Sequence, residues 1–230
     1  MKMFLGMPMG RQLCHPYAAR AFFRASQGEI EMTIMEMMAT SSLLTFSFNQ
    51  LWATAKNNDA DYFAMIHSDV IPDPGWMDVM YKELLETGAD IISAVIPIKN
   101  NSGLTSTALE TDDKWNPRRL TLYEIFDREE TFFDPQLLVN TGLWMCKMKS
   151  FWNTKDLIFH QEDSCRETKD GLQLLTFSED WGFSRQAKAN GARLFATRKV
   201  KLYHEFPVYH NHFAWGTTET DPLHQAKEPE

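Results

Sequence analysis

Two short acidic motifs in this sequence could carry chemistry, and the first follows an expected strand. His67-Ser68-Asp69 comes directly after residues 61–66, a nearly continuous apolar run typical of a strand covered on both faces. Ligands of open parallel sheets bind beyond the carboxyl ends of the strands. Asp69 and His67 therefore stand where a carboxylate and an imidazole could hold a divalent cation. A turn cap is the alternative interpretation of a strand that ends in Ser-Asp.

The second motif is Ser178-Glu179-Asp180, which begins a helical pattern over residues 178–189. Acidic residues in a first turn complement the helix dipole, and this capping role needs no catalysis. The neighbouring Trp181 and Phe183 favour a second interpretation, in which the carboxylates lie near an apolar pocket. A carboxylate in such a place can act as a general base. Both interpretations stay open on the residues alone.

Histidines gather towards the end of the sequence, where four of the seven lie within the last 27 residues. His210 and His212 would share one face of a strand and could form a metal pair. Solvated or hydrogen-bonded histidines are the alternative, because two imidazoles without a third convergent ligand are weak evidence for a metal.

The elements that must position these motifs alternate between strand and helix patterns through the first hundred residues. Apolar runs predict strands, and apolar residues at helical spacing predict helices. This order is typical of βαβ units and of a mainly parallel, Rossmann-like sheet. The expected strands cover residues 1–8, 29–35, 61–66 and 89–96, and the expected helices cover residues 17–26, 43–55 and 76–86.

The second half of the sequence has a mixed character. Residues 99–134 are rich in polar turn formers and predict loops and short antiparallel strands. An apolar segment at 136–148, the helix at 178–189 and a strand-like stretch at 193–204 follow. Without a repeat or a linker, we expect one domain over residues 1–230, with a second half at 100–216 and an acidic tail at 217–230 that need not be ordered.

Composition and charge exclude several classes of function. The 230 residues include 23 Lys and Arg against 31 Asp and Glu, a formal net charge of −8, and no basic block. We therefore expect no nucleic-acid partner and no strongly anionic membrane surface as partner. Three widely spaced cysteines fit reduced thiols. The first apolar run ends too soon at Pro8 for a signal peptide, and we expect no transmembrane segment and a cytoplasmic location.

In order and spacing, these motifs resemble the GT-A family of nucleotide-sugar glycosyltransferases, most closely its inverting, family 2-like group. Residues 61–72 look like the family's strand, its DxD motif and the proline-containing turn after it. Residues 89–99 look like the next strand. Asn140-Thr141-Gly142 resembles the acceptor-side turn, and Ser178-Glu179-Asp180 resembles the ED motif. The resemblance implies a GT-A fold whose first half, residues 1–99, binds the nucleotide-sugar.

The resemblance also implies a metal-assisted transfer of a sugar from a UDP- or GDP-sugar to an acceptor hydroxyl of unknown identity. Asp180 would be the general base, with Glu179 beside it. Asp69 would hold Mn²⁺ or Mg²⁺ on the donor diphosphate, and His204 and His67 would be further ligands. Looser assignments complete the implied site: Pro8, Met9, Asn49, Ser68 and Lys99 on the donor, and Trp181, His212 and Trp215 on the acceptor.

The sequence departs from the family pattern where His67 replaces the first acidic residue of DxD. An imidazole can bind a metal ion but supplies no second negative charge to it. This departure motivates an alternative function, a catalytically silent GT-A-like module that binds a nucleotide or a glycan. A retaining glycosyltransferase is another alternative. A nucleotidyltransferase would need a glycine-rich phosphate loop, and the turn after the first strand shows only Gly10 and Arg11.

Overall fold

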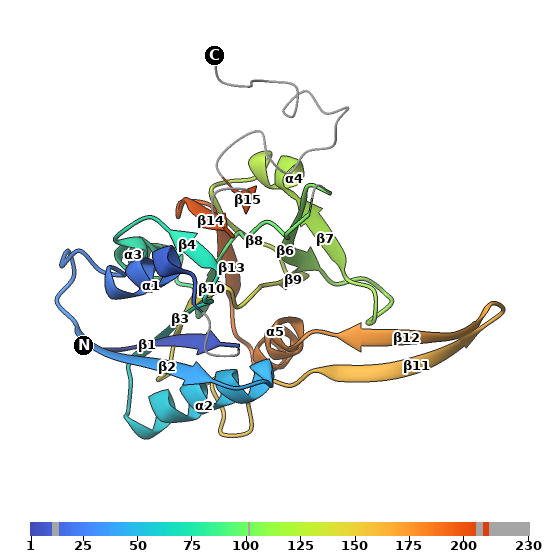
Figure 1. Ribbon diagram of the computed structural model, residues 1–230, viewed down its shortest axis with the longest axis horizontal. Coiled ribbons are helices and arrows are strands. Elements are labelled where there is room, and N and C mark those ends of the chain that lie inside the picture. Colours follow the sequence, from blue (N-terminus) through green and yellow to red (C-terminus); the bar gives the residue numbers. More distant parts are fainter. Residues whose placement is uncertain (11–13, 101, 206–208, 212–230) are drawn as a thin grey trace, which may run out of the picture.

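The computed structural model describes residues 1–10, 14–100, 102–205 and 209–211 (Figure 1). A seven-stranded sheet forms its centre, in the order β2-β1-β3-β10-β5-β13-β8. Five of its strands are parallel, whereas β10 and β8 run antiparallel to their neighbours. The strands are β1 (Lys2–Met9), β2 (Thr33–Thr40), β3 (Tyr62–Ile66), β5 (Ile91–Ala94), β8 (Thr131–Phe133), β10 (Leu143–Lys147) and β13 (Leu194–Thr197).

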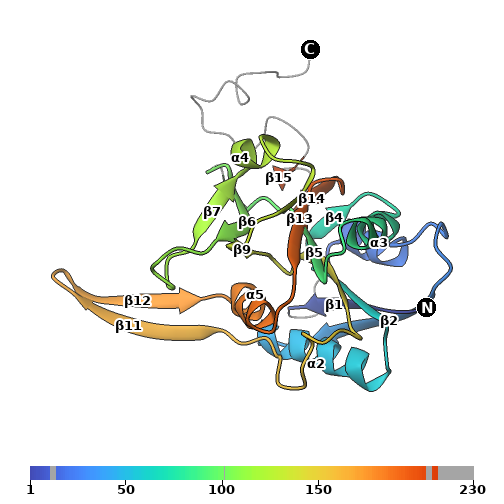
Figure 2. The same cartoon turned by 180° about the vertical axis from the view of Figure 1, so that it is seen from behind.

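Helices cover both faces of this sheet, and each pair buries its own apolar stripe (Figures 1 and 2). On one face, α1 (Pro16–Phe23) and α3 (Trp76–Glu86) pack on a cluster that includes Phe22, Trp76 and Met80. On the other face lie α2 (Leu44–Asn57) and α5 (Glu179–Ala189). The mixed α/β sheet flanked by helices confirms the expected fold class at this level.

The α2 and α5 face is dominated by aromatic rings. Trp52 of α2 lies edge-on to Phe183 of α5 with ring centroids 5.3 Å apart, and Trp144 of β10 is 5.3 Å from the same ring. Phe159 stacks on Phe183 at 4.2 Å. Large aromatic side chains bury much apolar area each, so this cluster fixes α5 against the centre of the sheet.

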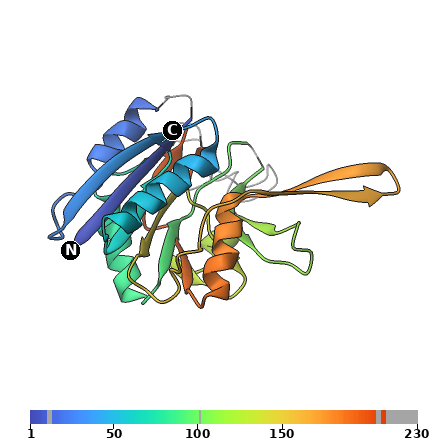
Figure 3. The same ribbon diagram turned by 90° about the horizontal axis from the view of Figure 1, so that it is seen from below.

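Three smaller sheets extend the second half. β4 (Val70–Pro72), β14 (Leu202–His204) and β15 (Tyr209–His210) form one, and β6 (Leu104–Leu109), β7 (Arg118–Thr121) and β9 (Leu137–Leu138) form another, with the short helix α4 (Leu122–Phe126) after β7. The third is a hairpin of β11 (Glu162–Thr168) and β12 (Gly171–Phe177), which projects from the body (Figure 3).

Some expected boundaries are wrong in ways that have physical causes. The second strand begins at Thr33 rather than at residue 29, since pairing with β1 sets its register. The segments 136–148 and 193–204 each contain two strands, because a turn at Asn140-Thr141-Gly142 and another at residues 198–201 redirect the chain. The tail at 217–230 lies outside the described residues. Among the described helices, none is long and apolar enough to cross a bilayer.

Candidate functional site

A cavity opens beyond the carboxyl ends of β1 and β3, where the strand order reverses. β2 lies on one side of β1 and β3 lies on the other, so the connections leave the sheet in opposite directions and a crevice forms between them. The cavity measures about 680 Å³, within the usual size of small-molecule sites. Its lining residues are Pro8, Gly10, Cys14, His15, Pro16, Leu44, His67, Ser68, Asp69, Lys99 and Glu205.

Backbone hydrogen bonds hold the Asp69 segment in place from three directions. The His67 amide donates to the Gly142 carbonyl at 2.8 Å, and the His15 amide donates to the Ser68 carbonyl at 2.9 Å. The carbonyl of Asp69 accepts from the amide of Glu205 at 2.9 Å. The motif is therefore a fixed turn between β3 and β4, and its carboxylate is presented to the cavity.

The Asp69 carboxylate lies beside a lysine and a histidine. It forms an ion pair with the Lys99 ammonium, which is also 3.7 Å from Glu205 Oε2. His204 Nε2 lies 3.7 Å from Asp69 Oδ1, and its Nδ1 is 2.7 Å from the Pro97 carbonyl, which orients the ring. Burial opposes ionisation of Asp69, but His204 and Lys99 outweigh it and hold the carboxyl pKa well below its usual range.

His67 is a half-buried residue of the cavity wall. Its ring lies 5.2 Å from that of Phe48, and its Nε2 is buried without a hydrogen-bond partner. Burial is the main cause that lowers the pKa of His67 to about 4. The imidazole is therefore neutral at pH 7 and adds no charge beside Asp69.

Asp180 lies in the first turn of α5, with Ser178 as the N-cap residue. The Ser178 hydroxyl donates to the Asp180 carboxylate, and the Trp181 amide donates to Oδ1 at 2.8 Å. Burial and the neighbouring Glu179 outweigh these contacts and raise the pKa of Asp180 to about 6. Burial also raises the pKa of Glu179. Asp180 can therefore exchange a proton near neutral pH.

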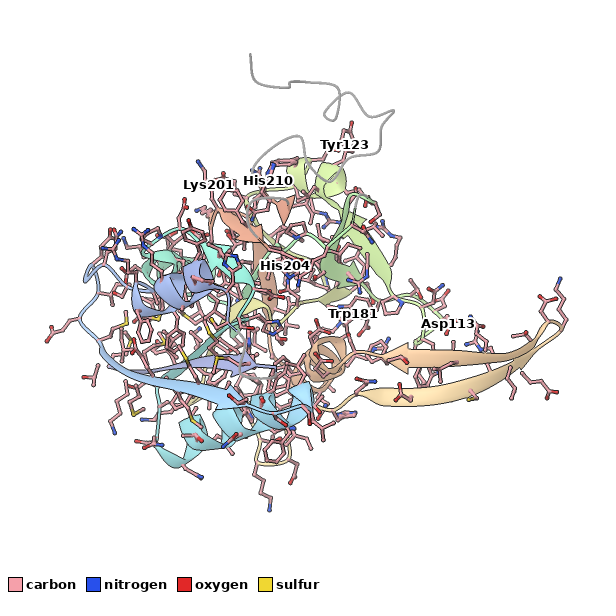
Figure 4. The ribbon with its side chains drawn as sticks, in the orientation of Figure 1. Asp113, Tyr123, Trp181, Lys201, His204 and His210 are labelled. Atoms are coloured by element: carbon pink, nitrogen blue, oxygen red, sulfur yellow. The ribbon has the colours of Figure 1, made fainter. Side chains whose placement is uncertain are left out.

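Asp69 and Asp180 both lie at the carboxyl edge of the central sheet. The end of α5 leads into the start of β13, so α5 runs against the parallel strands and its first turn lies at their carboxyl edge. Trp181 Nε1 donates to the Ser106 carbonyl at 3.2 Å, and the Ser106 amide donates to the carbonyl of Ile96, just after β5. Figure 4 shows His204 on β14 and Trp181 on α5.

The structure brings together five of the expected site residues as lining of the cavity: Pro8, His67, Ser68, Asp69 and Lys99. His204 joins them through Asp69. Met9, Glu179 and Asp180 are not among the lining residues.

Other expected residues have structural partners instead. The Asn49 amide exchanges two hydrogen bonds, of 2.7 and 2.8 Å, with the backbone of Phe159 and so ties a loop to α2. Trp181 is only 7% exposed, with the Arg119 guanidinium 4.5 Å from its ring centroid. Little of its surface is open to a sugar. His212 and Trp215 lie outside the described residues.

Sequence reasoning missed several lining residues, namely Cys14, His15, Pro16, Leu44 and Glu205. His15 caps α1, since its Nδ1 accepts from the Tyr17 amide at 3.3 Å. Cys14, His15, Pro16 and Leu44 could have been predicted from their place at the starts of α1 and α2, beside the strand ends. Glu205 has a positive φ of 60°, which is strained for a residue with a side chain. Nothing in the sequence indicates that conformation.

Within the described ranges, no group of three or more His, Cys, Asp and Glu side chains is placed to hold a metal ion. Asp69 and His204 nevertheless offer an oxygen and a nitrogen to the same space. Small hard cations take one or two carboxylates and complete their shell with water and substrate phosphate oxygens. The donor chemistry of these two residues therefore fits such an ion once Lys99 has moved off Asp69.

No protein-family model matches the sequence, and no curated protein matches it. Among solved structures, A197 from STIV is similar, with a TM-score of 0.51 and 16% sequence identity. The match covers 89% of this chain and 85% of the A197 chain. At this level of identity the likeness extends to the fold alone.

Proposed function

We propose that this protein is a nucleotide-sugar glycosyltransferase of the GT-A type, with the donor in the cavity at the ends of β1 and β3. The observation that carries the proposal is the lining of this cavity at the reversal of strand order. It combines Asp69, whose carboxyl pKa is well below its usual range, with Lys99, whose ammonium can meet phosphate charge. A mostly parallel sheet with helices on both faces agrees with the proposal.

Charge is what this cavity offers to a nucleoside diphosphate. Lys99 is 36% exposed, so its ammonium can leave Asp69 for a phosphate oxygen without crossing the core. Asp69 and His204 would then hold Mn²⁺ or Mg²⁺, which when bound neutralises charge on the diphosphate of the leaving group. His67, neutral and packed on Phe48, shapes the wall of the donor site rather than adding charge to it.

The proposed transfer is an inverting displacement with Asp180 as the base. The acceptor hydroxyl oxygen forms a bond to the anomeric carbon, and its proton passes to the Asp180 carboxylate. The bond from the anomeric carbon to the diphosphate oxygen breaks, and the nucleoside diphosphate leaves with the electron pair. A pKa of about 6 suits this role, because the carboxylate is ionised at pH 7 yet basic enough to accept a proton.

A second candidate is a binding module without transferase activity. Two observations favour it: Asp69 is already paired with Lys99, and Asp180 is not part of the cavity lining. In this case the protein binds a nucleotide-sugar or a nucleotide and releases it unchanged.

The test is a thermal-shift panel with UDP-, GDP-, CMP- and dTDP-sugars, each with and without Mn²⁺. Wild type is compared with Asp69→Ala and with Asn49→Ala, whose amide the structure assigns to the Phe159 loop. A ligand at 100 times its Kd adds about 2.7 kcal/mol of apparent stability. We expect stabilisation by one nucleotide class, absent in Asp69→Ala and kept in Asn49→Ala.

A donor found in this way is then incubated with the protein and a panel of acceptors. Sugar transfer with inversion at the anomeric carbon, seen by NMR, supports the transferase. Donor binding without turnover across the panel favours the binding module, and retention of configuration favours a retaining enzyme. If no nucleotide stabilises the protein, the assignment of this cavity as a donor site is wrong.

A further inference from the structure

The hairpin of β11 and β12 leaves apolar surface in water. It forms a sheet of two strands, and Figure 3 shows it extending away from the rest of the protein. Leu172 is 78% exposed and Leu174 is 69% exposed. An isolated two-stranded hairpin is marginally stable in water, and a third strand or a packed face is needed for independent stability.

Among the described residues, those of the body contact one face of the hairpin. Arg166 on β11 pairs with Asp113 at 3.2 Å, and Lys114 pairs with Glu162 at 3.2 Å. Figure 4 shows Asp113 beside the hairpin. The Arg185 guanidinium lies 3.8 Å from the ring centroid of the buried Phe177. Side chains alternate between faces along a strand, so Leu172 and Leu174 point to the opposite, unsupported face.

The two strands of the hairpin differ in charge. β11 carries four charged residues, Glu162, Asp163, Arg166 and Glu167, whereas β12 reads Gly-Leu-Gln-Leu-Leu-Thr-Phe and carries none. Proteins protect exposed strand edges with charges, prolines or bulges, and β12 has none of these. One edge of β12 pairs with β11, and the other pairs with no strand in the described part of the chain.

We propose that β12 pairs antiparallel with β12 of a second copy of this chain, joining two hairpins into one four-stranded sheet. Such pairing is two-fold symmetric, so the strand must be complementary to itself. Full overlap of the seven residues places Leu174 opposite Leu174 of the other copy and Leu172 opposite Thr176. No like charges meet in this arrangement, because β12 has no charged side chain.

The other edge of the hairpin does not fit itself in the same way. Full antiparallel overlap of two β11 strands would place Asp163 opposite Glu167 of the second copy, and Glu167 opposite Asp163. Like charges directly opposite each other are destabilising in a sheet. The charge pattern therefore selects β12, and not β11, as the edge that meets a second copy.

The first experiment measures mass in solution by size-exclusion chromatography with light scattering. We expect twice the chain mass of 26.7 kDa for the wild type and a single chain mass for Leu174→Lys. Cys165→Lys is the matched control, because Cys165 lies opposite Leu174 on the neighbouring strand and away from the proposed edge. We expect this control to remain a dimer. Far-UV circular dichroism verifies that each variant is folded.

The second experiment tests the register by oxidation of introduced cysteines. In a Cys165→Ser background, Leu174→Cys places two thiols directly opposite each other, at a Cα separation that a disulfide can span. Leu172→Cys places them too far apart. We expect a covalent dimer for the first variant and none for the second.

Three results would overturn the proposal. These are a wild-type monomer at micromolar concentration, a dimer that persists in Leu174→Lys, and a Cys165→Lys variant that dissociates. A monomer would mean that the edge stays open or is covered within the same chain. A cross-link at Leu172→Cys in place of Leu174→Cys would overturn the full-overlap pairing.

Discussion

Asp69 and Asp180 are the same residue type at the same edge of the sheet, yet their surroundings act in opposite directions. Around Asp69, His204 and Lys99 outweigh burial and depress the carboxyl pKa. Around Asp180, burial and the adjacent Glu179 raise it to about 6. The first carboxylate is fixed as an anion and suits a cation, and the second suits proton transfer. Their neighbours, and not their identity, divide the roles.

The largest expected effect comes from removing the proton acceptor. Asp180→Asn keeps the shape of the side chain and should lower kcat by about 10²- to 10⁴-fold, because general-base catalysis is lost. Donor affinity, measured by calorimetry, should stay unchanged. Glu179→Gln is the matched control and should lose less activity. Full turnover by Asp180→Asn would remove Asp180 from the mechanism.

The pH dependence of kcat should follow the ionisation of Asp180. Below about pH 6 the ionised fraction falls about tenfold per pH unit, so the rate should fall with the same slope. Glu179→Gln removes a negative neighbour and should move the midpoint to lower pH. Steady-state rates between about pH 4.5 and 8 measure both effects. A rate that is constant across this range would contradict the assignment.

The contributions of Asp180 and Asp69 to the free energy of unfolding should change with pH in opposite directions and over different pH ranges. Asp180 has a raised pKa in the folded protein, so its stabilising contribution is present below its unfolded value of 3.8 and is lost as pH rises through about 6. Asp69 has a depressed pKa, so its contribution is present above 3.8 and is lost as pH falls below it.

Urea denaturation of Asp180→Asn and Asp69→Asn across these windows measures this difference. Asp180→Asn should flatten the slope between about pH 4 and 6, a change on the order of 2 kcal/mol. Asp69→Asn should reduce the pH dependence of the unfolding free energy only below about pH 3.8. If both variants change the same window, the two sites do not differ as proposed.

The smallest expected effect concerns the competition between Lys99 and a metal ion for Asp69. Exposed ion pairs contribute up to about 1 kcal/mol, so Lys99→Met should tighten Mn²⁺ binding by at most about 5-fold. Calorimetric titration with MnCl₂ alone measures this. Lys149→Met, which removes the partner of Asp61 elsewhere on the protein, is the control. Weaker Mn²⁺ binding in Lys99→Met would contradict the competition.

Parts of this arrangement could be predicted from local sequence. Residues 76–86 form α3 with the expected bounds, because Gly75 and Gly88 flank a regular amphipathic stretch. The apolar run before His67 becomes β3, and His67, directly after its end, lines the cavity. Local sequence patterns were sufficient to predict a helix or strand that packs along its whole length against the core.

Other parts depend on distant contacts that a local pattern does not contain. Lys99 after β5 meets Asp69 after β3 although the two residues are 30 positions apart in the sequence. Glu205 reaches the cavity through a strained backbone conformation. The hairpin of β11 and β12 buries little of its surface, so its residues show no marked hydrophobic period. Asn49 was expected at the donor as a polar residue and Trp181 at the acceptor as an aromatic one, but each finds its hydrogen-bond partner in a segment distant in the sequence.

The antiparallel strand β10 has a consequence for how the chain folds. It lies between β3 and β5 in the sheet, yet it follows β5 in the chain after a long stretch that includes β6, β7, α4, β8 and β9. During synthesis β3 and β5 each keep an unpaired edge until β10 is made, and such a state is prone to aggregation. Completion of the sheet therefore requires a long loop closure late in translation, and we expect slow refolding.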